Sequence, residues 1–251
     1  MFILHDSMAV TQKFSCQVEQ LLDHGDHVHT VVLRPSRRVP RFHPGQFLHL
    51  AIDSYDPTGF WPDSRAFSIA SPPTERNRIR ISYSVQGRFT TRMEKELVEG
   101  GEVWVKMPYG KFLVDASTDV VILAGGTGIT AFIGFLERLQ PNGQRVHLTY
   151  GARTRDLLIY KESILDCMER VPALDVCFFI ERGHENKAAE DLPGQHEHQG
   201  RVSVASAWPR IPRPLEATYY IAGPPAMLDT VSQDLRARGI AQKAINIDAW
   251  E

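Results

Sequence analysis

The sequence predicts two domains of different fold class: an all-β domain over residues 1–115 and an α/β domain over residues 116–251. Three observations carry this prediction. Short alternating runs separated by turn residues fill the first half. The apolar run 120–124 then leads into a glycine-rich turn, as a strand buried on both faces would. After that turn, apolar runs alternate with helical patterns, as in βαβ units with a parallel sheet.

The composition fits two ordinary domains. Of the 251 residues, 43% are hydrophobic and 23% are charged, which is typical of globular proteins. The formal net charge of −2 favours neither nucleic acid nor a membrane surface as a partner. No apolar run approaches the ~18 residues that span a bilayer, and the first residues lack a signal-peptide pattern. The sequence therefore predicts a cytoplasmic protein.

Residues that bind metals are not arranged as a site. The three cysteines, Cys16, Cys167 and Cys177, form no CxxC pair, so we expect neither an iron–sulfur cluster nor structural zinc. Two groups of histidines lie close in sequence: His24, His27 and His29, and His184, His196 and His198. Neither group is completed by cysteines or an ordered set of carboxylates. We therefore expect no metal.

In the first half, turn residues separate six short apolar runs. The expected strands are 14–20, 28–33, 46–52, 66–70, 79–85 and 102–107. One helix is expected over about residues 90–99, with Met93 and Leu97 on one face. Strands of this length and spacing predict a small antiparallel barrel or sandwich.

One stretch of this half carries groups that suit a planar, phosphorylated ligand. In Arg65-Ala66-Phe67-Ser68, the arginine and the phenylalanine share one face of a strand. A guanidinium can pair with a diphosphate in a forked geometry, and an aromatic ring can stack on a planar one. The same pattern also fits a strand with a salt-bridged arginine.

A second stretch opens the expected helix. In Gly87-Arg88-Phe89-Thr90-Thr91, either threonine is a plausible N-cap. The same geometry would also present backbone N–H groups to an anion.

The second half begins with the strand 120–124, followed by Gly125, Gly126, Thr127, Gly128 and Thr130. A strand, a glycine turn and a helix in this order present N–H groups to a phosphate, although a turn without a ligand fits as well. Further strands are expected at 146–150, 174–180, 218–222 and 244–248, and an exposed loop over 181–200. Helices are expected after the glycine turn, around Ile164 and Met168, and from Met227 to Leu235.

Taken with Pro44-Gly45-Gln46-Phe47 and Pro108-Tyr109-Gly110-Lys111-Phe112, these stretches resemble the ferredoxin–NADP reductase superfamily. The resemblance implies a flavin-binding barrel followed by a doubly wound, nucleotide-binding domain. It implies that Arg65 pairs with the diphosphate of FAD, that Phe67 flanks the isoalloxazine and that Ser68 lies near flavin N5. The remaining flavin-binding residues that it implies are Tyr83, Val85, Gly87 and Thr90.

In the second domain the resemblance assigns the glycine turn to the dinucleotide diphosphate. Arg153, in Tyr150-Gly151-Ala152-Arg153-Thr154, would lie on the adenosine side, and Gly223-Pro224 would be the other nucleotide signature. Ala222 stands where the family often has a cysteine. The ending Asp248-x-Trp250 is similar to an acidic-x-aromatic ending in which the aromatic covers the flavin. Ser68, Asp248 and Trp250 are thus the expected catalytic residues.

The expected function is hydride transfer between NAD(P)H and FAD, with single electrons passed to ferredoxin, flavodoxin or an oxygenase component. A reductase that uses flavin as a substrate, and a non-catalytic redox-sensing subunit, are the alternatives. NADH and NADPH are not distinguished, although Arg153 or Arg182 could meet a 2′-phosphate. The basic run from Arg34 to Arg41 is either a solvated edge or a contact for an acidic partner protein.

Overall fold

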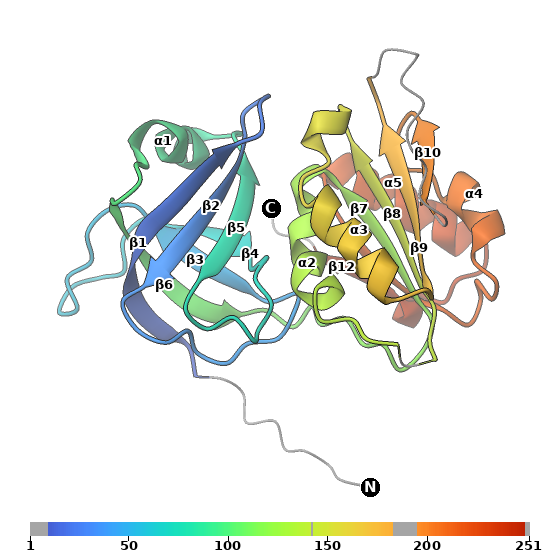
Figure 1. Cartoon of the computed structure of the whole chain (residues 1–251), viewed down its shortest axis with the longest axis horizontal. Coiled ribbons are helices and arrows are strands. Elements are labelled where there is room, and N and C mark those ends of the chain that lie inside the picture. The colour runs from blue at the N-terminus through green and yellow to red at the C-terminus, as the bar shows by residue number, and fades with distance from the viewer. Residues whose placement is uncertain (1–9, 142, 183–194, 249–251) are drawn as a thin grey trace, which may run out of the picture.

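The computed structural model describes residues 10–141, 143–182 and 195–248. They form two sheets that lie side by side, with the chain passing once from the barrel to the α/β domain (Figure 1). The last strand of the first sheet ends at Tyr109 and the first strand of the second begins at Val120. The expected boundary between residues 115 and 116 lies in the segment that joins them.

The amino-terminal sheet is an antiparallel near-barrel. Its strands are β1 (Gln12–Asp23), β2 (Val28–Pro35), β3 (Phe47–Ala51), β4 (Arg65–Ser68), β5 (Ile79–Ser84) and β6 (Glu102–Tyr109). They pair in the order β4-β3-β6-β1-β2-β5. The two edge strands approach each other where the Ala70 N–H donates to the Arg80 carbonyl at 2.8 Å. Of the two expected folds, barrel and sandwich, the structure is therefore the barrel.

The helix α1 (Arg88–Glu96) packs onto the barrel core. Its buried residues are Phe89 and Met93, which lie on one face because they are four residues apart. The helix begins two residues earlier than expected, and its N-cap is Gly87 rather than a threonine. Thr90 instead stands at the third helical position, where its Oγ1 accepts from the Gly87 N–H at 3.2 Å.

The carboxyl-terminal sheet is parallel throughout. Its strands are β7 (Val120–Gly125), β8 (Val146–Ala152), β9 (Leu174–Ile180), β10 (Gln195–Gln199), β11 (Thr218–Ala222) and β12 (Ile245–Asp248), and its helices are α2 (Thr130–Leu136), α3 (Lys161–Arg170), α4 (Val204–Ala207) and α5 (Pro225–Ala237). Helices α2 and α3 cover one face, and α4 and α5 the other (Figure 1). The strand order β10-β9-β8-β7-β11-β12 reverses its direction between β7 and β11. The predicted doubly wound fold is confirmed.

The prediction of a loop over residues 181–200 is wrong at its end, because β10 pairs in parallel with β9 from Gln195↔Val176 to Gln199↔Ile180. The strand is polar and lies at the sheet edge, so no apolar pattern marks it. His196 and His198 lie on this strand, while His184 lies outside the described residues.

The barrel packs directly against α2. A Cβ added to Gly134 would lie 2.8 Å from the Ser71 carbonyl oxygen, so the helix backbone touches the segment that follows β4. Arg80, on β5, donates to both carboxylate oxygens of Glu137 at 2.7 and 2.8 Å. Its guanidinium also lies 5.5 Å from the centroid of the Tyr160 ring. Apolar packing and one half-buried ion pair thus fix the two domains against each other.

We expect Arg80→Ala to lower the free energy of unfolding by about 1–3 kcal/mol, because the half-buried Glu137 carboxylate loses its counter-ion. Arg92→Ala is the matched control, since Arg92 forms exposed ion pairs with Asp53 and Glu96 that contribute at most about 1 kcal/mol. Urea denaturation measures both. Equal losses would show that the Arg80–Glu137 pair adds nothing beyond an exposed one.

Candidate functional site

The barrel meets the carboxyl edge of the parallel sheet at Ser68 and Asp248. Ser68 ends β4, and its hydroxyl donates to Asp248 Oδ2 at 3.4 Å. Asp248 ends β12, where it pairs in register with Ala222 of β11. Two of the three expected catalytic residues are thus brought together from opposite domains. The third, Trp250, lies outside the described residues.

Asp248 is held in surroundings that favour its protonated form. The residue is 7% exposed, and its Oδ1 has no hydrogen-bond partner among the described residues. Burial raises the pKa of Asp248 to about 7, and the hydrogen bond from Ser68 only partly opposes that rise. The carboxyl group therefore changes its protonation state near neutral pH.

The expected nucleotide-binding turns lie at the reversal point of the sheet. Gly125 ends β7 and Gly223 follows β11, and these two strands are neighbours. A Cβ on Gly128 would lie 2.5 Å from the Ala222 carbonyl oxygen, and one on Gly125 would lie 2.5 Å from Met227 Sδ. Since real Cβ atoms do not approach backbone atoms so closely, glycine is required at Gly128, whereas at Gly125 the Met227 side chain would have to move. In doubly wound sheets, ligands bind outside the strand ends at such a reversal.

Other residues of the turns have defined local roles. Gly126 adopts φ +53°, in the left-handed region that glycine tolerates, and a 3-10 turn over Gly126–Ile129 follows β7. Thr130 is buried, and its hydroxyl donates to the Thr127 carbonyl at 2.7 Å. Thr130 therefore closes the turn with its side chain. Pro224 is the N-cap residue of α5.

Arg65 lies at the start of β4 beside the first turn of α1. Its Nη1 donates to Asp63 Oδ1 at 3.0 Å, and its guanidinium lies 5.4 Å from the centroid of the Phe89 ring. The Arg88 guanidinium lies 3.7 Å from the same Asp63 carboxylate and is 87% exposed. A Cβ on Gly87 would meet nothing within 4 Å. Two guanidinium groups share one carboxylate beside open space at a helix start, which suits a diphosphate.

Sequence reasoning did not single out Arg88 or Asp63 as part of this group. Arg88 directly follows Gly87, so its position in the expected anion-binding stretch was the available signal. Asp63 lies two residues before Arg65. In an extended chain, side chains two residues apart point to the same side of the backbone.

The expected flavin-contacting side chains differ in exposure. Phe67 is half-buried on β4, with its ring centroid 6.1 Å from that of Tyr83. Tyr83 is buried in the barrel core, and burial raises the pKa of its hydroxyl. Val85 is partly buried and packs against the same core. Phe67 is therefore partly accessible to solvent, whereas Tyr83 beside it is buried.

Arg153 follows β8 and reaches across to the barrel. Its Nη2 donates to the Asp26 carbonyl at 3.0 Å, and its Nη1 lies 3.6 Å from the Asp26 carboxylate. The side chain is 44% exposed. This arginine thus lies beside the carboxyl edge of the sheet, where the resemblance places the adenosine, and it already has a partner from the other domain.

The histidines at the start of the chain pair with a carboxylate. His27 Nδ1 and His29 Nε2 lie 2.8 and 3.0 Å from the same oxygen of Glu94. His24 Nε2 lies 2.9 Å from the Thr30 hydroxyl. Each of these three histidines is therefore explained by a hydrogen bond to another side chain.

Another cluster with metal-binding atoms lies within the parallel sheet. Ligand atoms of His147, Asp175 and Cys177 lie within 4.8 Å of one another. The Asp175 carboxylate, however, pairs with His147 at 2.7 Å and with both a nitrogen Nε and an Nη of Arg210. The second ring nitrogen of His147 lies 3.0 Å from the Thr149 hydroxyl. A guanidinium thus occupies the place a cation would take, and the arrangement is a satisfied polar network.

The α/β domain, with its two glycine turns, is similar to a known nucleotide-binding domain. Residues 122–233 match the family model of the oxidoreductase NAD-binding domain. This match runs from β7 into α5 and includes both glycine turns. The predicted resemblance to the ferredoxin–NADP reductase superfamily is confirmed.

Individual proteins are similar to this chain over most of its length. The chain is 28% identical over 209 residues to the electron transfer component of anthranilate 1,2-dioxygenase from Acinetobacter baylyi. The aligned region covers 80% of this chain and 55% of that protein. A cytochrome P450 reductase from Amycolatopsis has a TM-score of 0.79 at 18% identity, over 96% of this chain and 71% of that one. The flavohemoprotein-like FAD/NAD-binding domain of a Vibrio cholerae nitric oxide dioxygenase has a TM-score of 0.75 at 17% identity. That match covers 94% of this chain and 97% of the Vibrio domain.

These matches differ in coverage and in sequence identity, and both limit what can be concluded from them. The chain spans about half the length of the first curated relatives that it matches, 55% and 53%. The solved structures are under 25% identical and therefore establish the fold. No helix among the described residues has the length and apolarity that a membrane crossing requires.

We expect Asp248→Asn to stabilise the protein more at pH 8 than at pH 5. In the unfolded chain this carboxyl group ionises at about pH 4, whereas burial raises its pKa to about 7 in the folded protein, so between these values only the unfolded chain is ionised. Stability is therefore lost as pH rises through this window, by about 1–4 kcal/mol for the wild type. Asparagine cannot ionise and escapes this loss. Thermal melting across pH 5–8 measures the difference.

Asp53→Asn is the control for that experiment. Its pKa is lowered by the hydrogen bond from Arg92, so its stabilising contribution is present at neutral pH and is lost in acid. The asparagine variant should then be less stable than the wild type at pH 8, opposite in sign to Asp248→Asn. If both variants changed the stability at pH 8 in the same direction, the conclusion that Asp248 is protonated in the folded protein would be wrong.

We also expect Gly128→Ala to destabilise the protein by about 1–3 kcal/mol, because its methyl group would collide with the Ala222 backbone. Gly59→Ala is the control, since the nearest atom to its added Cβ lies at 3.5 Å, an ordinary contact. Chemical denaturation measures both variants. If Gly128→Ala were as stable as the control, the two turns would not be in contact.

Proposed function

We propose that the protein is a flavoprotein oxidoreductase that transfers a hydride between NAD(P)H and FAD and passes electrons singly to a separate acceptor. The observation that carries this proposal is the contact between Ser68 and Asp248. This contact joins the end of β4, next to Phe67, to the carboxyl edge of the parallel sheet, where the two glycine turns lie. A flavin held by the barrel and a nicotinamide held by the sheet would then be neighbours.

The barrel residues fit FAD. Arg65 and Arg88 together carry two positive charges against the single carboxylate of Asp63, beside the first turn of α1. A diphosphate would complete the balance of charge. Phe67, half-buried on the same strand, would flank the flavin ring, while Tyr83 and Val85 support the strand behind it. When bound, FAD supplies the two-electron to one-electron conversion that amino-acid side chains cannot perform.

The α/β domain fits a dinucleotide. The turn Gly125–Gly128 and the turn at Gly223-Pro224 lie against each other at the reversal point between β7 and β11. The glycines of both turns carry no side chain, which lets the backbone approach a diphosphate closely. Arg153 would face the adenosine side of the nucleotide. Exchange of its Asp26 partner for a 2′-phosphate would favour NADPH, and retention of that partner would favour NADH.

Ser68 and Asp248 would manage the proton and orient the reacting rings. The buried Asp248 carboxyl changes protonation near pH 7, so it can hold a proton at Oδ1 or release it during turnover. Ser68 donates to the other oxygen, which fixes the orientation of the carboxyl group. Ala222, next to Asp248 across the strands, contributes only a methyl group, so nicotinamide orientation rests on backbone and packing.

The electron acceptor is part of the proposal. The relative from Acinetobacter is named as the electron transfer component of a dioxygenase, and the Amycolatopsis protein as a cytochrome P450 reductase. By these likenesses the acceptor would be an oxygenase component or a carrier such as ferredoxin or flavodoxin. The proposed location is the cytoplasm.

The deciding experiment is an anaerobic titration of the FAD-loaded protein with NADH and, separately, with NADPH. Bleaching of the flavin absorbance by either nucleotide, followed by turnover with the neutral acceptor menadione, is the expected result. A protein that loses its flavin on desalting yet reduces added flavin would instead be a flavin reductase. Nucleotide binding without any bleaching would identify a non-catalytic subunit.

We expect Arg65→Ala to weaken FAD binding by about 2–4 kcal/mol, because the diphosphate loses a charged, forked partner. Arg88→Ala should weaken it less, since that side chain is 87% exposed. Arg92→Ala on the same helix is the control, because its guanidinium pairs with Asp53 and Glu96. Flavin fluorescence on dialysis gives the three dissociation constants. Full FAD retention in Arg65→Ala would refute the diphosphate assignment.

A further inference from the structure

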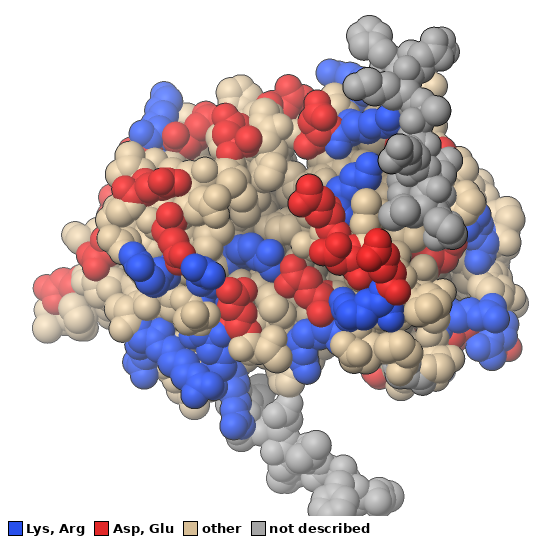
Figure 2. Space-filling view, in the orientation of Figure 1, with Lys and Arg blue, Asp and Glu red and all other residues tan. Residues whose placement is uncertain are grey.

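A group of basic side chains gathers at the lower edge of the barrel domain (Figure 2). It surrounds a pocket of about 670 Å³ lined by Glu19, Arg34, Pro35, Arg37, Arg38, Thr74, Arg76, Asn77 and Arg78. Five of these nine residues are arginines and one is acidic. We call this cavity the arginine pocket. The basic run predicted from sequence supplies one side of it, and the segment before β5 supplies the other.

Few of these positive charges are balanced within the chain. Arg78 forms a forked pair with the Glu19 carboxylate, with Nε and Nη2 at 3.0 and 2.7 Å from Oε1. Arg76 donates to the Val39 carbonyl from Nε at 2.8 Å. In the described part of the chain, the side chains of Arg37 and Arg38 form no hydrogen bond or ion pair. Burial and then the nearby charges of Arg38 and Arg41 lower the pKa of Arg76. Concentrated like charge of this kind favours binding of an anion.

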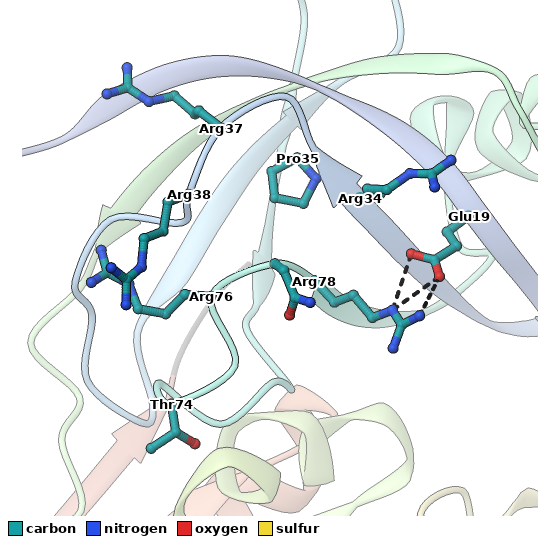
Figure 3. Close-up of a pocket in the computed structure, with 9 residues that line it drawn as sticks. Glu19, Arg34, Pro35, Arg37, Arg38, Thr74, Arg76 and Arg78 are labelled. Carbon is teal, nitrogen blue, oxygen red and sulfur yellow. Dashed lines mark hydrogen bonds and ion pairs between the residues drawn. The ribbon is translucent and has the colours of Figure 1, made fainter.

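The charges are spread over two groups. In Figure 3, Arg37, Arg38 and Arg76 lie on one side of Pro35, and Arg78 with Glu19 lies on the other. A single small anion would meet only one of these groups. The pocket is therefore suited to an extended ligand with several separated negative charges.

Carboxylates suit the pocket better than nucleic acid does. Glu19 already shows one carboxylate held there in the forked geometry that arginine favours. The lining residues include no aromatic side chain on which a base could stack. The chain as a whole also has a net charge of −2, unlike a domain that binds nucleic acid by charge.

The arginine pocket is remote from the proposed flavin diphosphate residues. Its residues Thr74–Arg78 precede β5, whereas Gly87 and α1 follow that strand. The six residues of β5, at about 3.3 Å each, separate the two ends by about 20 Å. The pocket is thus a surface of its own rather than a part of the cofactor site.

We propose that the arginine pocket is a docking site for an acidic segment of a partner protein, with two or more Asp or Glu carboxylates held by its guanidinium groups. This inference goes beyond the proposed redox function, because it concerns a binding surface and holds whatever reaction the protein catalyses. Such a site would anchor the partner on the barrel while leaving the flavin and nucleotide residues free.

The test uses the full-length, FAD-loaded protein and an octaglutamate peptide carrying a neutral fluorophore, with binding followed by fluorescence anisotropy. We expect saturable binding at about 20 mM NaCl that weakens at least about tenfold at about 300 mM, since screening reduces the attraction. Arg37→Glu/Arg38→Glu should weaken binding at low salt by at least about tenfold. Arg37→Lys/Arg38→Lys keeps the charge without the fork and should give a smaller loss.

Arg138→Glu/Arg236→Glu is the matched control, because it changes net charge equally at two exposed arginines outside the pocket. We expect it to change the affinity less than about twofold. An equal loss in this control, or no binding to the wild type, would overturn the proposal. Tighter competition by octauridylate or by tripolyphosphate than by unlabelled peptide would also overturn it, in favour of a phosphate polyanion.

Circular dichroism, flavin content and menadione turnover are measured on the same variants. Unchanged values in Arg37→Glu/Arg38→Glu, together with lost peptide binding, assign the loss to the arginine pocket. If menadione turnover is absent in every protein, including the wild type, while peptide binding follows the expected pattern, the docking site stands and the redox proposal fails.

Discussion

The close approach of two backbone turns governs the arrangement of the α/β domain. The turn after β7 and the turn after β11 touch, with no room for a Cβ at Gly128. This contact is possible because the strand order reverses between β7 and β11, so consecutive connections leave in opposite directions. A side chain at Gly128 would collide with the backbone of Ala222 and Gly223, at the carboxyl ends of these strands. Those ends are what face the barrel.

The barrel reaches that edge through contacts of different character. Ser68 meets Asp248 at the strand ends, Arg80 pairs with Glu137 beside α2, and Arg153 pairs with Asp26 above the sheet. The first contact holds a carboxyl group that ionises near neutral pH. The second is half-buried and sets the packing of the domains. The third is exposed and can exchange its partner at small cost. Rigid packing and an exchangeable contact therefore coexist at one domain boundary.

The arginines at the two ends of the barrel differ in how closely their charges are grouped. Beside α1, Arg65 and Arg88 share the carboxylate of Asp63, so their charge is concentrated in one place. At the opposite end, the arginine pocket spreads its charges on both sides of Pro35. Compact charge suits a diphosphate and spread charge suits several carboxylates. The net charge of −2 does not reveal either group of arginines. Charges act locally, within a Debye length of about 8–10 Å, so the sum over the chain says little about one surface.

The sequence by itself determined the two fold classes, the strands with apolar patterns and the two glycine turns, because these depend on neighbours along the chain. It did not reveal β10, whose polar residues pair through backbone hydrogen bonds alone. It placed the cap of α1 at a threonine, whereas Gly87 caps the helix and Thr90 reaches back to it. Only the tertiary structure brought Ser68 to Asp248 and gathered Arg76 and Arg78 beside the predicted basic run. Contacts between residues 180 apart in the chain leave no local pattern, since they depend on how whole domains pack.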